Sequence, residues 1–397
     1  MATSKNKSLS ANKPLKIVLI AGEDSGDMLG ASLMQAMKKQ SRRPLIFSGL
    51  GGPRMEAEGL DLFFPIAGLN LLGLVEVLGS VQTIRQKLNK AVDKIVEADP
   101  DVVVTIDLPG FNKRLAKRLR DRSARAKLIH YVAPTVWAWR PGRAKKFNQL
   151  FDQILCLYPF EPPYFKEGKK QKAVFVGHPL AFEEPLGSAQ DFRQQYGIDT
   201  GIELIAVLPG SRIKEVERLL PVFEKVLERV KQTIPNCAVV IPVVEHLRDM
   251  IEDRIKSWSV PVCVLGQERR QDAYAACSVA VAASGTVALE LAKAKLPMVI
   301  AYKVHWLTAM IAKRLLKTKF VCLLNILAAK EVIPEFLQEK CRPDLIASKV
   351  VELVKNKVQR MDQVKEAQLC LEQLRGGGQY PSELAGQEVL RIFHETN

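Results

Sequence analysis

The loop Gly22–Asp27 carries three carboxylates directly after an apolar run. Its spacing is not GxGxxG, so a dinucleotide fingerprint is absent, and the negative charges disfavour a phosphate ligand. Such a loop suits a ligand with hydroxyl groups. It also opens a helical pattern, where Asp24 or Ser25 could instead act as a cap. The candidate site residues of this loop are Glu23, Ser25, Gly26 and Asp27, with the cap as the alternative.

A further carboxylate, Asp107, ends the apolar run Val102–Ile106. Ligands of open parallel sheets bind at the carboxyl ends of the strands, so Asp107 is placed to act as a general base. The alternative is a turn residue, because Pro109 and Gly110 follow. We favour the base, and we add Asn112, which closes the same segment, as a candidate binding residue.

Two glycine turns in the second half precede helical patterns and suit a phosphate-bearing ligand. In Leu208-Pro-Gly-Ser-Arg212 an arginine could grip a diphosphate through two parallel hydrogen bonds. In Ala283-Ser-Gly-Thr-Val-Ala-Leu-Glu290 the turn could hold phosphate and the glutamate a ribose diol. The alternative for the second turn is a tight turn with a solvent glutamate. The predicted binding residues are Gly210, Ser211, Arg212, Ser284, Gly285, Thr286 and Glu290.

Other candidate motifs are set aside. Asp99-Pro-Asp101 matches a DxD metal motif but precedes its strand, so it is interpreted as a turn. His178 taken alone is interpreted as structural. The seven cysteines are dispersed without CxxC spacing, which predicts reduced packing residues and no zinc site. We therefore expect no metal.

The elements that must position these residues alternate between apolar runs and helical patterns. Runs rich in Val and Ile between helices are typical of parallel sheets covered on both faces. The pattern restarts after the polar stretch Phe182–Thr200, and 397 residues suffice for two or three domains. We predict a disordered leader over 1–14, α/β domains over 15–185 and 186–375, and a C-terminal helix over 376–397 that follows a glycine hinge.

The net charge of +15 indicates an anionic partner. The stretch from Phe111 to Leu150 contains 12 lysines and arginines but only one acidic residue, Asp121. This stretch contains Trp137 and follows the apolar segment Leu60–Val81, a combination that favours an anionic lipid surface. Nucleic acid is the rival partner, but no nucleic-acid motif is present. We find no signal peptide and no run of the roughly 20 apolar residues that would span a bilayer.

Taken together, the ordered motifs resemble the lipid-A-disaccharide synthase family over nearly the whole chain. Asp24, where the family usually has a small residue, and the polar leader depart from its pattern. The resemblance is carried by Ala21-Gly-Glu-Asp-Ser-Gly-Asp27, Gly49-Leu-Gly-Gly-Pro-Arg-Met55, Gly73-Leu-Val-Glu-Val77, Asp107-Leu-Pro-Gly-Phe-Asn112, Tyr131-Val-Ala-Pro-Thr-Val-Trp-Ala-Trp139, Phe175-Val-Gly-His-Pro179, Leu208-Pro-Gly-Ser-Arg-Ile-Lys-Glu-Val216, Ala283-Ser-Gly-Thr286 and Asn325.

The resemblance implies an inverting GT-B glycosyltransferase, with two Rossmann-like domains facing a cleft and the last helix returning to a first domain. It implies transfer from UDP-2,3-diacylglucosamine to 2,3-diacylglucosamine 1-phosphate, without a cofactor, at the cytoplasmic face of a Gram-negative inner membrane. Within this picture Asp107 is the first candidate base, and Asp27 and Glu23 are the next. Asn325 and Gln338 are added on the nucleotide side, and Trp137 on the substrate side.

Alternatives remain at this stage. Another GT-B transferase or a UDP-sugar 2-epimerase would share the two domains, and a non-catalytic binder of anionic membrane or nucleic acid would explain the charge alone. The C-terminal segment could return to its own domain or swap within a homodimer.

Overall fold

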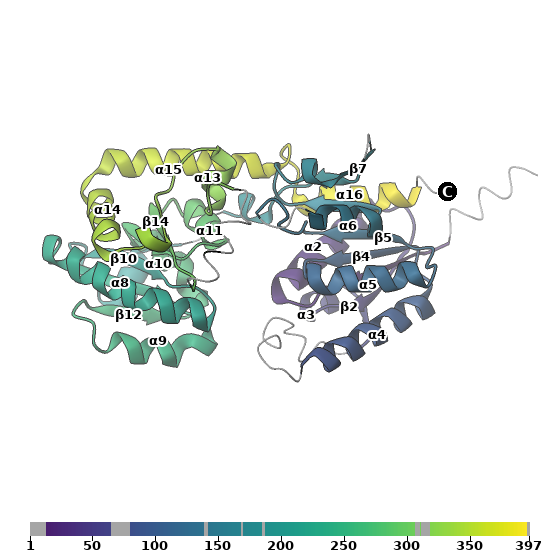
Figure 1. Cartoon of the computed structure of the whole chain (residues 1–397), viewed down its shortest axis with the longest axis horizontal. Coiled ribbons are helices and arrows are strands. Elements are labelled where there is room, and N and C mark those ends of the chain that lie inside the picture. Colours follow the sequence, from purple (N-terminus) through teal and green to yellow (C-terminus); the bar gives the residue numbers. More distant parts are fainter. Residues whose placement is uncertain are drawn as a thin grey trace, which may run out of the picture. The chain divides into compact units, whose positions relative to one another are not determined.

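The computed structural model describes residues 13–64, 80–138, 142–167, 170–184, 187–305, 310 and 318–394. The chain forms two compact units (Figure 1). Unit 1 comprises the chain up to Pro179 and again from Leu374 onward, and unit 2 comprises Leu180–Gln373. The predicted boundaries at 185 and 375 lie a few residues from these divisions.

Unit 1 is built on a seven-stranded parallel sheet of order β3-β2-β1-β4-β5-β6-β9. Its strands are runs of apolar and β-branched residues, and all five residues of β4 are buried, as expected for a sheet covered on both faces. The strands are β1 (Leu15–Ile20), β2 (Leu45–Leu50), β3 (Asp61–Leu62), β4 (Val102–Ile106), β5 (Lys127–Tyr131), β6 (Gln153–Cys156) and β9 (Ala173–Phe175), with β7 (Lys166–Glu167) and β8 (Lys170–Gln171) as a separate antiparallel pair.

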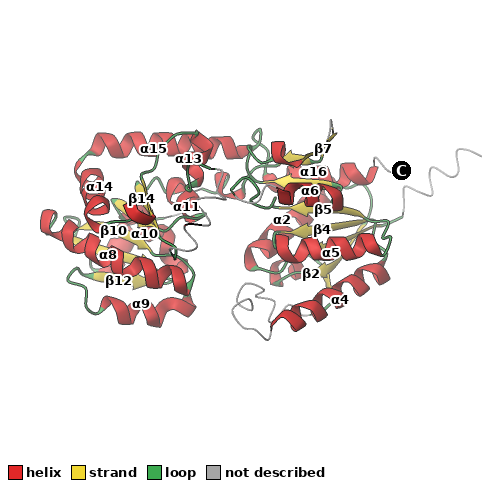
Figure 2. Cartoon of the chain, in the orientation of Figure 1, coloured by secondary structure: helices red, strands yellow, loops and turns green. Residues whose placement is uncertain are grey.

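The helices of unit 1 lie on both sides of the sheet (Figure 2). One layer, formed by α4, α5 and α6, buries an apolar cluster that includes Leu88, Leu115 and Phe147. The other layer contains α2, on which α16 packs. The helices are α2 (Asp24–Gln40), α3 (Pro53–Ala57), α4 (Ser80–Ala98), α5 (Pro109–Asp121), α6 (Gly142–Leu150) and α16 (Pro381–His394).

Unit 2 repeats the arrangement with a six-stranded parallel sheet of order β12-β11-β10-β13-β14-β15. Helices α8, α9 and α14 contribute to the core on one face, and α7 and α10 to that on the other. The elements are α7 (Ala189–Tyr196), β10 (Glu203–Leu208), α8 (Ile213–Thr233), β11 (Cys237–Pro242), α9 (Arg248–Ile255), β12 (Val262–Leu265), α10 (Arg270–Ala276), β13 (Val279–Ala282), α11 (Val287–Lys293), β14 (Met298–Tyr302), α13 (Leu323–Ala328), β15 (Glu335–Leu337), α14 (Pro343–Lys355) and α15 (Lys357–Glu372).

Both sheets reverse their strand order at one point, between β1 and β4 in unit 1 and between β10 and β13 in unit 2. Ile20 lies opposite Thr105 at the first point, and Leu208 lies opposite Ala282 at the second. Ligands of doubly wound sheets bind at such switch points, beyond the carboxyl ends of the strands. The predicted α/β class with two Rossmann-like domains is confirmed.

The last helix completes unit 1. Gly386 of α16 lies so close to α2 that a Cβ there would be 2.8 Å from Oε1 of Gln40. Gln40 also donates a hydrogen bond to the Glu383 carbonyl, and the Arg43 guanidinium lies over the Phe393 ring. In this chain α16 therefore packs on its own α2.

All seven cysteines are unpaired, and five of them are buried. Among the described helices, none combines the length and the apolar character needed to cross a membrane.

Candidate functional site

Asp107 follows β4 in a strained backbone. Asp107 and Leu108 have φ of +50° and +45°, and Val132, at the end of the neighbouring β5, has φ of +74°. Such conformations cost about 1–3 kcal/mol each in non-glycine residues and gather at functional sites. The Asp107 N–H donates to the Tyr131 carbonyl at 2.9 Å. The strand ends therefore fix where this carboxylate lies.

The Asp107 carboxyl lies half-buried at the switch point. Burial raises its pKa above the ordinary value, while a hydrogen bond from the Leu108 N–H opposes the rise. The buried Asn112 amide donates to the carbonyls of Asp107, at 2.6 Å, and Ile106, at 3.3 Å. Asn112, predicted to bind substrate, thus holds the loop that carries the candidate base.

The loop after β1 gives its predicted residues different roles. Asp27 is buried, and its carboxylate accepts hydrogen bonds from the N–H groups of Gly52 (2.7 Å), Arg54 (3.0 Å) and Met55 (3.0 Å). It therefore caps the start of α3. Because its oxygens are engaged in this way, we withdraw Asp27 from the candidate bases.

Glu23 occupies the N-cap position of α2 and remains a candidate base. The alternative of a cap at Asp24 or Ser25 does not hold, because both lie exposed inside the first turn. Gly26 is buried, and a Cβ there would lie 3.3 Å from Cβ of Ala21. Its lack of a side chain lets the start of α2 approach the strand ends.

A buried carboxyl that sequence reasoning missed, Glu161, lies at the same edge of the sheet. Its Oε1 accepts from Nε1 of Trp137, and its Oε2 accepts from the N–H groups of Leu157 and Tyr158, all at 3.1 Å. Burial raises the pKa of Glu161 to about 8, against the effect of these hydrogen bonds. An isolated acid within Tyr158-Pro-Phe-Glu-Pro162 was the available signal.

Aromatic rings surround Glu161. Trp137 meets Phe160 edge-on at 5.2 Å, and Tyr158 stacks on Phe160 at 5.5 Å and on His178 at 5.7 Å between ring centroids. Burial raises the pKa of the Tyr158 hydroxyl, and the charges of Glu161 and Asp107 raise it further. The cluster is therefore electrostatically coupled to the candidate base.

Trp137 requires a correction, because it is predicted as a binding residue on the substrate side, within a stretch that favours a lipid surface. Its side chain is only 7 % exposed, and its N–H is taken by Glu161. Trp137 therefore packs inside unit 1 and helps to hold Glu161 in place. Trp139 and most of the apolar segment Leu60–Val81 lie outside the described residues.

The loop after β10 presents Arg212 to solvent. Gly210 has φ of +115°, and a Cβ there would lie 2.6 Å from Oε2 of Glu215, so the position requires glycine. Ser211 is exposed. The Arg212 side chain is 69 % exposed and pairs with Oε1 of Glu215 at 2.9 Å, which also accepts from the Tyr302 hydroxyl at 3.4 Å. The Arg212 guanidinium is thus held by Glu215 while most of the side chain stays exposed to solvent.

The loop after β13 lies next to that of β10, because the two strands are neighbours. Ser284 is half-buried and its Oγ donates to the Val321 carbonyl at 3.4 Å, while Gly285 and Thr286 are exposed. Glu290 is half-buried and pairs with Nε of Arg270 at 3.5 Å. Burial raises its pKa, and the Arg270 charge opposes the rise. Glu290 is therefore not a free solvent glutamate.

Asn325 and Gln338 serve the fold of unit 2. The buried Asn325 amide donates to the Ile333 carbonyl and to Glu335, and its oxygen accepts from the N–H groups of Val332 and Ile333, all at 2.7–2.8 Å. An asparagine side chain has no further capacity, so we withdraw Asn325 as a ligand contact. With its amide oxygen and nitrogen assigned so that both find partners, Gln338 pairs with the Val304 backbone at 3.1 and 3.3 Å, beside the end of β14.

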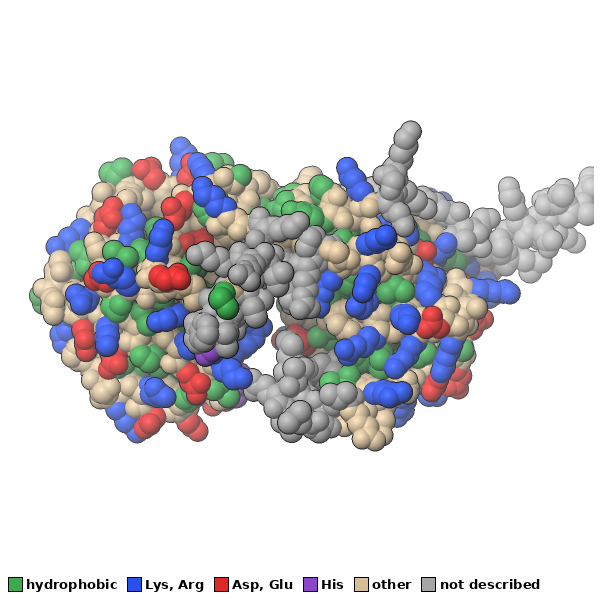
Figure 3. Space-filling model, viewed as in Figure 1, with side chains coloured by type: hydrophobic (Ala, Val, Ile, Leu, Met, Phe, Trp, Pro, Cys, Tyr) green, Lys and Arg blue, Asp and Glu red, His purple; other side chains and the backbone are tan. Residues whose placement is uncertain are grey.

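Basic side chains gather over α5 and its neighbours (Figure 3). Some have structural partners, since Arg120 pairs with Asp152 and Arg122 with Asp93. The exposed members, which we call the basic face, are Arg114, Lys117, Arg122, Arg125, Lys145 and Lys146.

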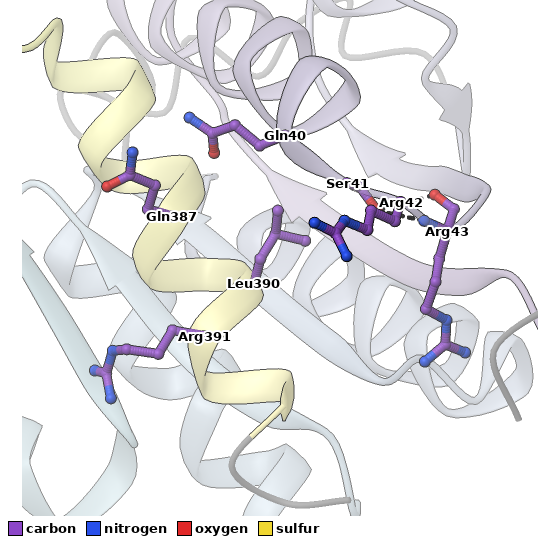
Figure 4. Close-up of a pocket in the computed structure, with 7 residues that line it drawn as sticks. All are labelled: Gln40, Ser41, Arg42, Arg43, Gln387, Leu390 and Arg391. Carbon is purple, nitrogen blue, oxygen red and sulfur yellow. Dashed lines mark hydrogen bonds between the residues drawn. The ribbon is translucent and has the colours of Figure 1, made fainter. Parts of the chain in front are cut away.

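A pocket between α2 and α16 lies away from these loops (Figure 4). It forms at the C-terminal end of α2, whose 17 residues extend over about 25 Å from the Glu23 loop. It is therefore separate from the candidate site. Its lining residues are Gln40, Ser41, Arg42, Arg43, Gln387, Leu390 and Arg391.

Solved structures share this architecture. A Staphylococcus aureus MnaA–UDP structure matches with a TM-score of 0.63 at 12% identity, covering 96% of this chain and 97% of that one. UDP-GlcNAc 2-epimerase from Neisseria meningitidis, bound to UDP-GlcNAc, matches with a TM-score of 0.62 at 10% identity, covering 96% and 100%. The double Rossmann-like fold is that of GT-B glycosyltransferases and related epimerases.

The sequence narrows this class. A family model described as lipid-A-disaccharide synthetase matches residues 17–389. Lipid-A-disaccharide synthases from Rhodospirillum centenum and Paramagnetospirillum magneticum are 42% and 43% identical over 383 residues, covering 96% of this chain and 95% and 98% of theirs. The chain belongs to the lipid-A-disaccharide synthase family, which is a family of glycosyltransferases.

Proposed function

We propose that this chain transfers 2,3-diacylglucosamine from its UDP derivative to the 6-hydroxyl of 2,3-diacylglucosamine 1-phosphate. The products are the β-1,6-linked disaccharide 1-phosphate and UDP. The family supports the reaction, and the UDP and UDP-GlcNAc bound in the two matching structures support a UDP-sugar donor. The observation that carries the chemistry is the half-buried Asp107 at the switch point of unit 1.

In this mechanism Asp107 accepts the proton of the acceptor 6-hydroxyl as that oxygen attacks the anomeric carbon of the donor. The bond between the anomeric carbon and the diphosphate oxygen breaks, and its electron pair leaves with UDP, so the anomeric centre inverts. Glu23 is the next candidate base. Burial of Asp107 supports its role, because a raised pKa makes a carboxylate a stronger base.

Unit 2 would hold the leaving group. Arg212 and Ser211 offer donors for the diphosphate, and the turn Ser284–Thr286 adds further donors beside them. Glu290, kept in place by Arg270, would accept hydrogen bonds from the ribose hydroxyls. Donors that are already in position when the leaving group becomes charged commonly lower the barrier of such reactions more than any other single effect.

We further propose that the chain works as a peripheral protein on the anionic cytoplasmic surface of the inner membrane. The basic face supports this placement, because each lysine or arginine near an anionic surface contributes about 1 kcal/mol. The two acylated substrates would reside in the same surface.

The experiment is UDP release from UDP-2,3-diacylglucosamine in detergent, with and without the acceptor, in the presence and absence of EDTA. Release that requires the acceptor and survives EDTA is the expected result. Release without acceptor would indicate hydrolysis, and conversion of the donor sugar without UDP release would indicate epimerisation. Either outcome would overturn the proposed transfer.

A further inference from the structure

Four cations form a cluster where α5 and α6 begin. Lys113 and Arg114 lie on α5, and Arg143 and Lys146 lie on α6, all within the first two turns of their helices. The two helices pack on each other. Burial lowers the pKa of Lys113, and the charges of Lys146, Arg143 and Arg114 lower it further, so these cations lie close enough to repel.

This cluster opposes the stability of the fold. Neither helix has an acidic residue in its first turn, and Arg143 in that position opposes the helix dipole. Within the part of the chain that the structure describes, no carboxylate pairs with Lys113. Arg120 and Arg122, further along α5, do have such partners. Lys113 thus lies among like charges and opposite no carboxylate of the described residues, an arrangement that points to an anionic ligand.

Lys113, the first residue of the cluster, directly follows Asn112, whose side chain holds the loop of the candidate base Asp107. Asn112 donates its 2.6 Å hydrogen bond to the Asp107 carbonyl, and Lys113 follows it on the helix. From Pro109 to Lys113 the helix rises about 6 Å. The acceptor carries its reacting hydroxyl and its phosphate on one sugar ring, so a base and a phosphate site must lie this near to each other.

We propose that Lys113, Arg114, Arg143 and Lys146 bind the phosphate of the acceptor sugar while Asp107 faces its hydroxyl. The inference rests on the proposed function and specifies how the acceptor is held. A phosphomonoester carries about −1.5 to −2 charge at neutral pH and would offset the mutual repulsion of the cations. A phosphate of a membrane lipid has the same chemistry, so the experiment must separate the two sources.

The test compares two acceptors in detergent, 2,3-diacylglucosamine 1-phosphate and the same sugar without its phosphate. Lys113→Gln is expected to lower kcat/KM about tenfold for the phosphorylated acceptor and to leave that for the phosphate-free acceptor unchanged, because only the first makes the charge-assisted contact. The matched control is Lys127→Gln, a half-buried lysine at the amino end of β5, which should change neither value. Thermal melting should show Lys113→Gln to be at least as stable as the parent, since it relieves repulsion.

Three outcomes would overturn the proposal. Equal losses for both acceptors would indicate a general effect on the site, and no loss would remove Lys113 from acceptor binding. Reduced sedimentation with phosphatidylglycerol vesicles, without a change in the ratio of the two acceptors, would assign the cluster to lipid. If the parent protein releases no UDP, the proposed function fails. Direct binding of glucosamine 1-phosphate against glucosamine, in parent and Lys113→Gln, then tests the phosphate site by itself.

Discussion

The side-chain amide of Asn112 donates a hydrogen bond of 2.6 Å to the main-chain carbonyl of Asp107. This contact joins the first turn of α5 to the end of β4, and it spans a backbone in which Asp107 and Leu108 both have positive φ. The strained loop is therefore held by a side chain that follows it by one helical turn. The position of the candidate base depends on that contact.

Asp107→Asn should abolish most of the turnover while the protein stays folded. Asparagine tolerates the left-handed conformation but cannot accept the hydroxyl proton, and loss of a general base costs about 100- to 10,000-fold in rate. The measurement is kcat for UDP release together with UDP affinity, which should not change. Asp99→Asn is the control, because Asp99 has φ of +43° at the opposite end of β4. Near-normal turnover in Asp107→Asn would transfer the role to Glu23.

The pH profile of kcat/KM should fall on its acid side at a higher pH than an ordinary aspartate would give. Burial raises the pKa of Asp107, and the protonated carboxyl cannot accept a proton, so the rate declines as pH falls through that raised pKa. The profile of the free enzyme reports this group. An acid limb in the ordinary aspartate range would contradict the assignment.

Glu161→Gln and Trp137→Phe should show strong coupling. A glutamine can accept either from the Trp137 N–H or from the backbone N–H groups of Leu157 and Tyr158, but its amide nitrogen clashes with the remaining donor. The single Glu161→Gln variant should raise the acceptor KM about tenfold, through a buried donor left unpaired. In a Trp137→Phe background the same change should cost little, because that donor is gone. Additive effects of the two changes would refute the pairing.

Acid should destabilise unit 1 through His130. This buried ring packs against Phe147 and Phe151, at 5.1 and 5.0 Å between centroids, and burial lowers its pKa from 6.5 to about 3. The unfolded chain therefore binds the proton first, and stability falls as pH drops from 6.5 toward 3. Between pH 7 and pH 5 the loss should be about 2 kcal/mol. Urea unfolding at both values, with His130→Leu, checks this, since the variant should show a loss smaller by that amount.

Gly177→Ala should loosen the return of the C-terminal segment. Gly177 has φ of +92°, and a Cβ there would lie 2.9 Å from the Leu374 carbonyl oxygen, which also accepts from the His178 N–H at 2.9 Å. Gly59→Ala isolates the conformational cost, because Gly59 has φ of +80° with open space around it. Gly177→Ala should lower the melting temperature more than Gly59→Ala and increase cleavage near Gly376–Gly378. Equal shifts in the two variants would refute the clash.

The sequence predicts the fold well where a strand is a continuous apolar run. Val102–Ile106 and Glu203–Leu208 are predicted and observed as strands. A strand that is buried on both faces consists almost entirely of apolar residues, and such a run is visible in the sequence. β2, whose six residues include Ser48, Gly49 and an exposed Ile46, and the three-residue β15 are absent from the predicted series. Glu335–Leu337 has three residues, which local pattern cannot separate from a turn.

The site is harder to predict, because chemistry-bearing residues also satisfy buried backbone groups. Asp27 and Asn325 have the right types, yet their partners, at Gly52–Met55 and Val332–Glu335, are set by tertiary packing. Glu161 was missed for the same reason, because its hydrogen bond from Trp137 and its burial both arise from tertiary packing. Asp107, Arg212 and Ser284 are recognisable from their places just after strands.

Unit 1 is formed by two stretches of chain that lie far apart in the sequence, and this constrains how it folds during translation. The face of α2 that receives α16 is made early, whereas α16 follows the whole of Leu180–Gln373. At roughly 5–20 residues per second, translation of that interval takes on the order of ten seconds or more. During that time Met37 and its neighbours on α2 lack their cover, because unit 2 is synthesised before α16. Unit 1 therefore stays incomplete and open to aggregation until the last helix has been synthesised. Docking of α16 on α2 is the final step in its folding.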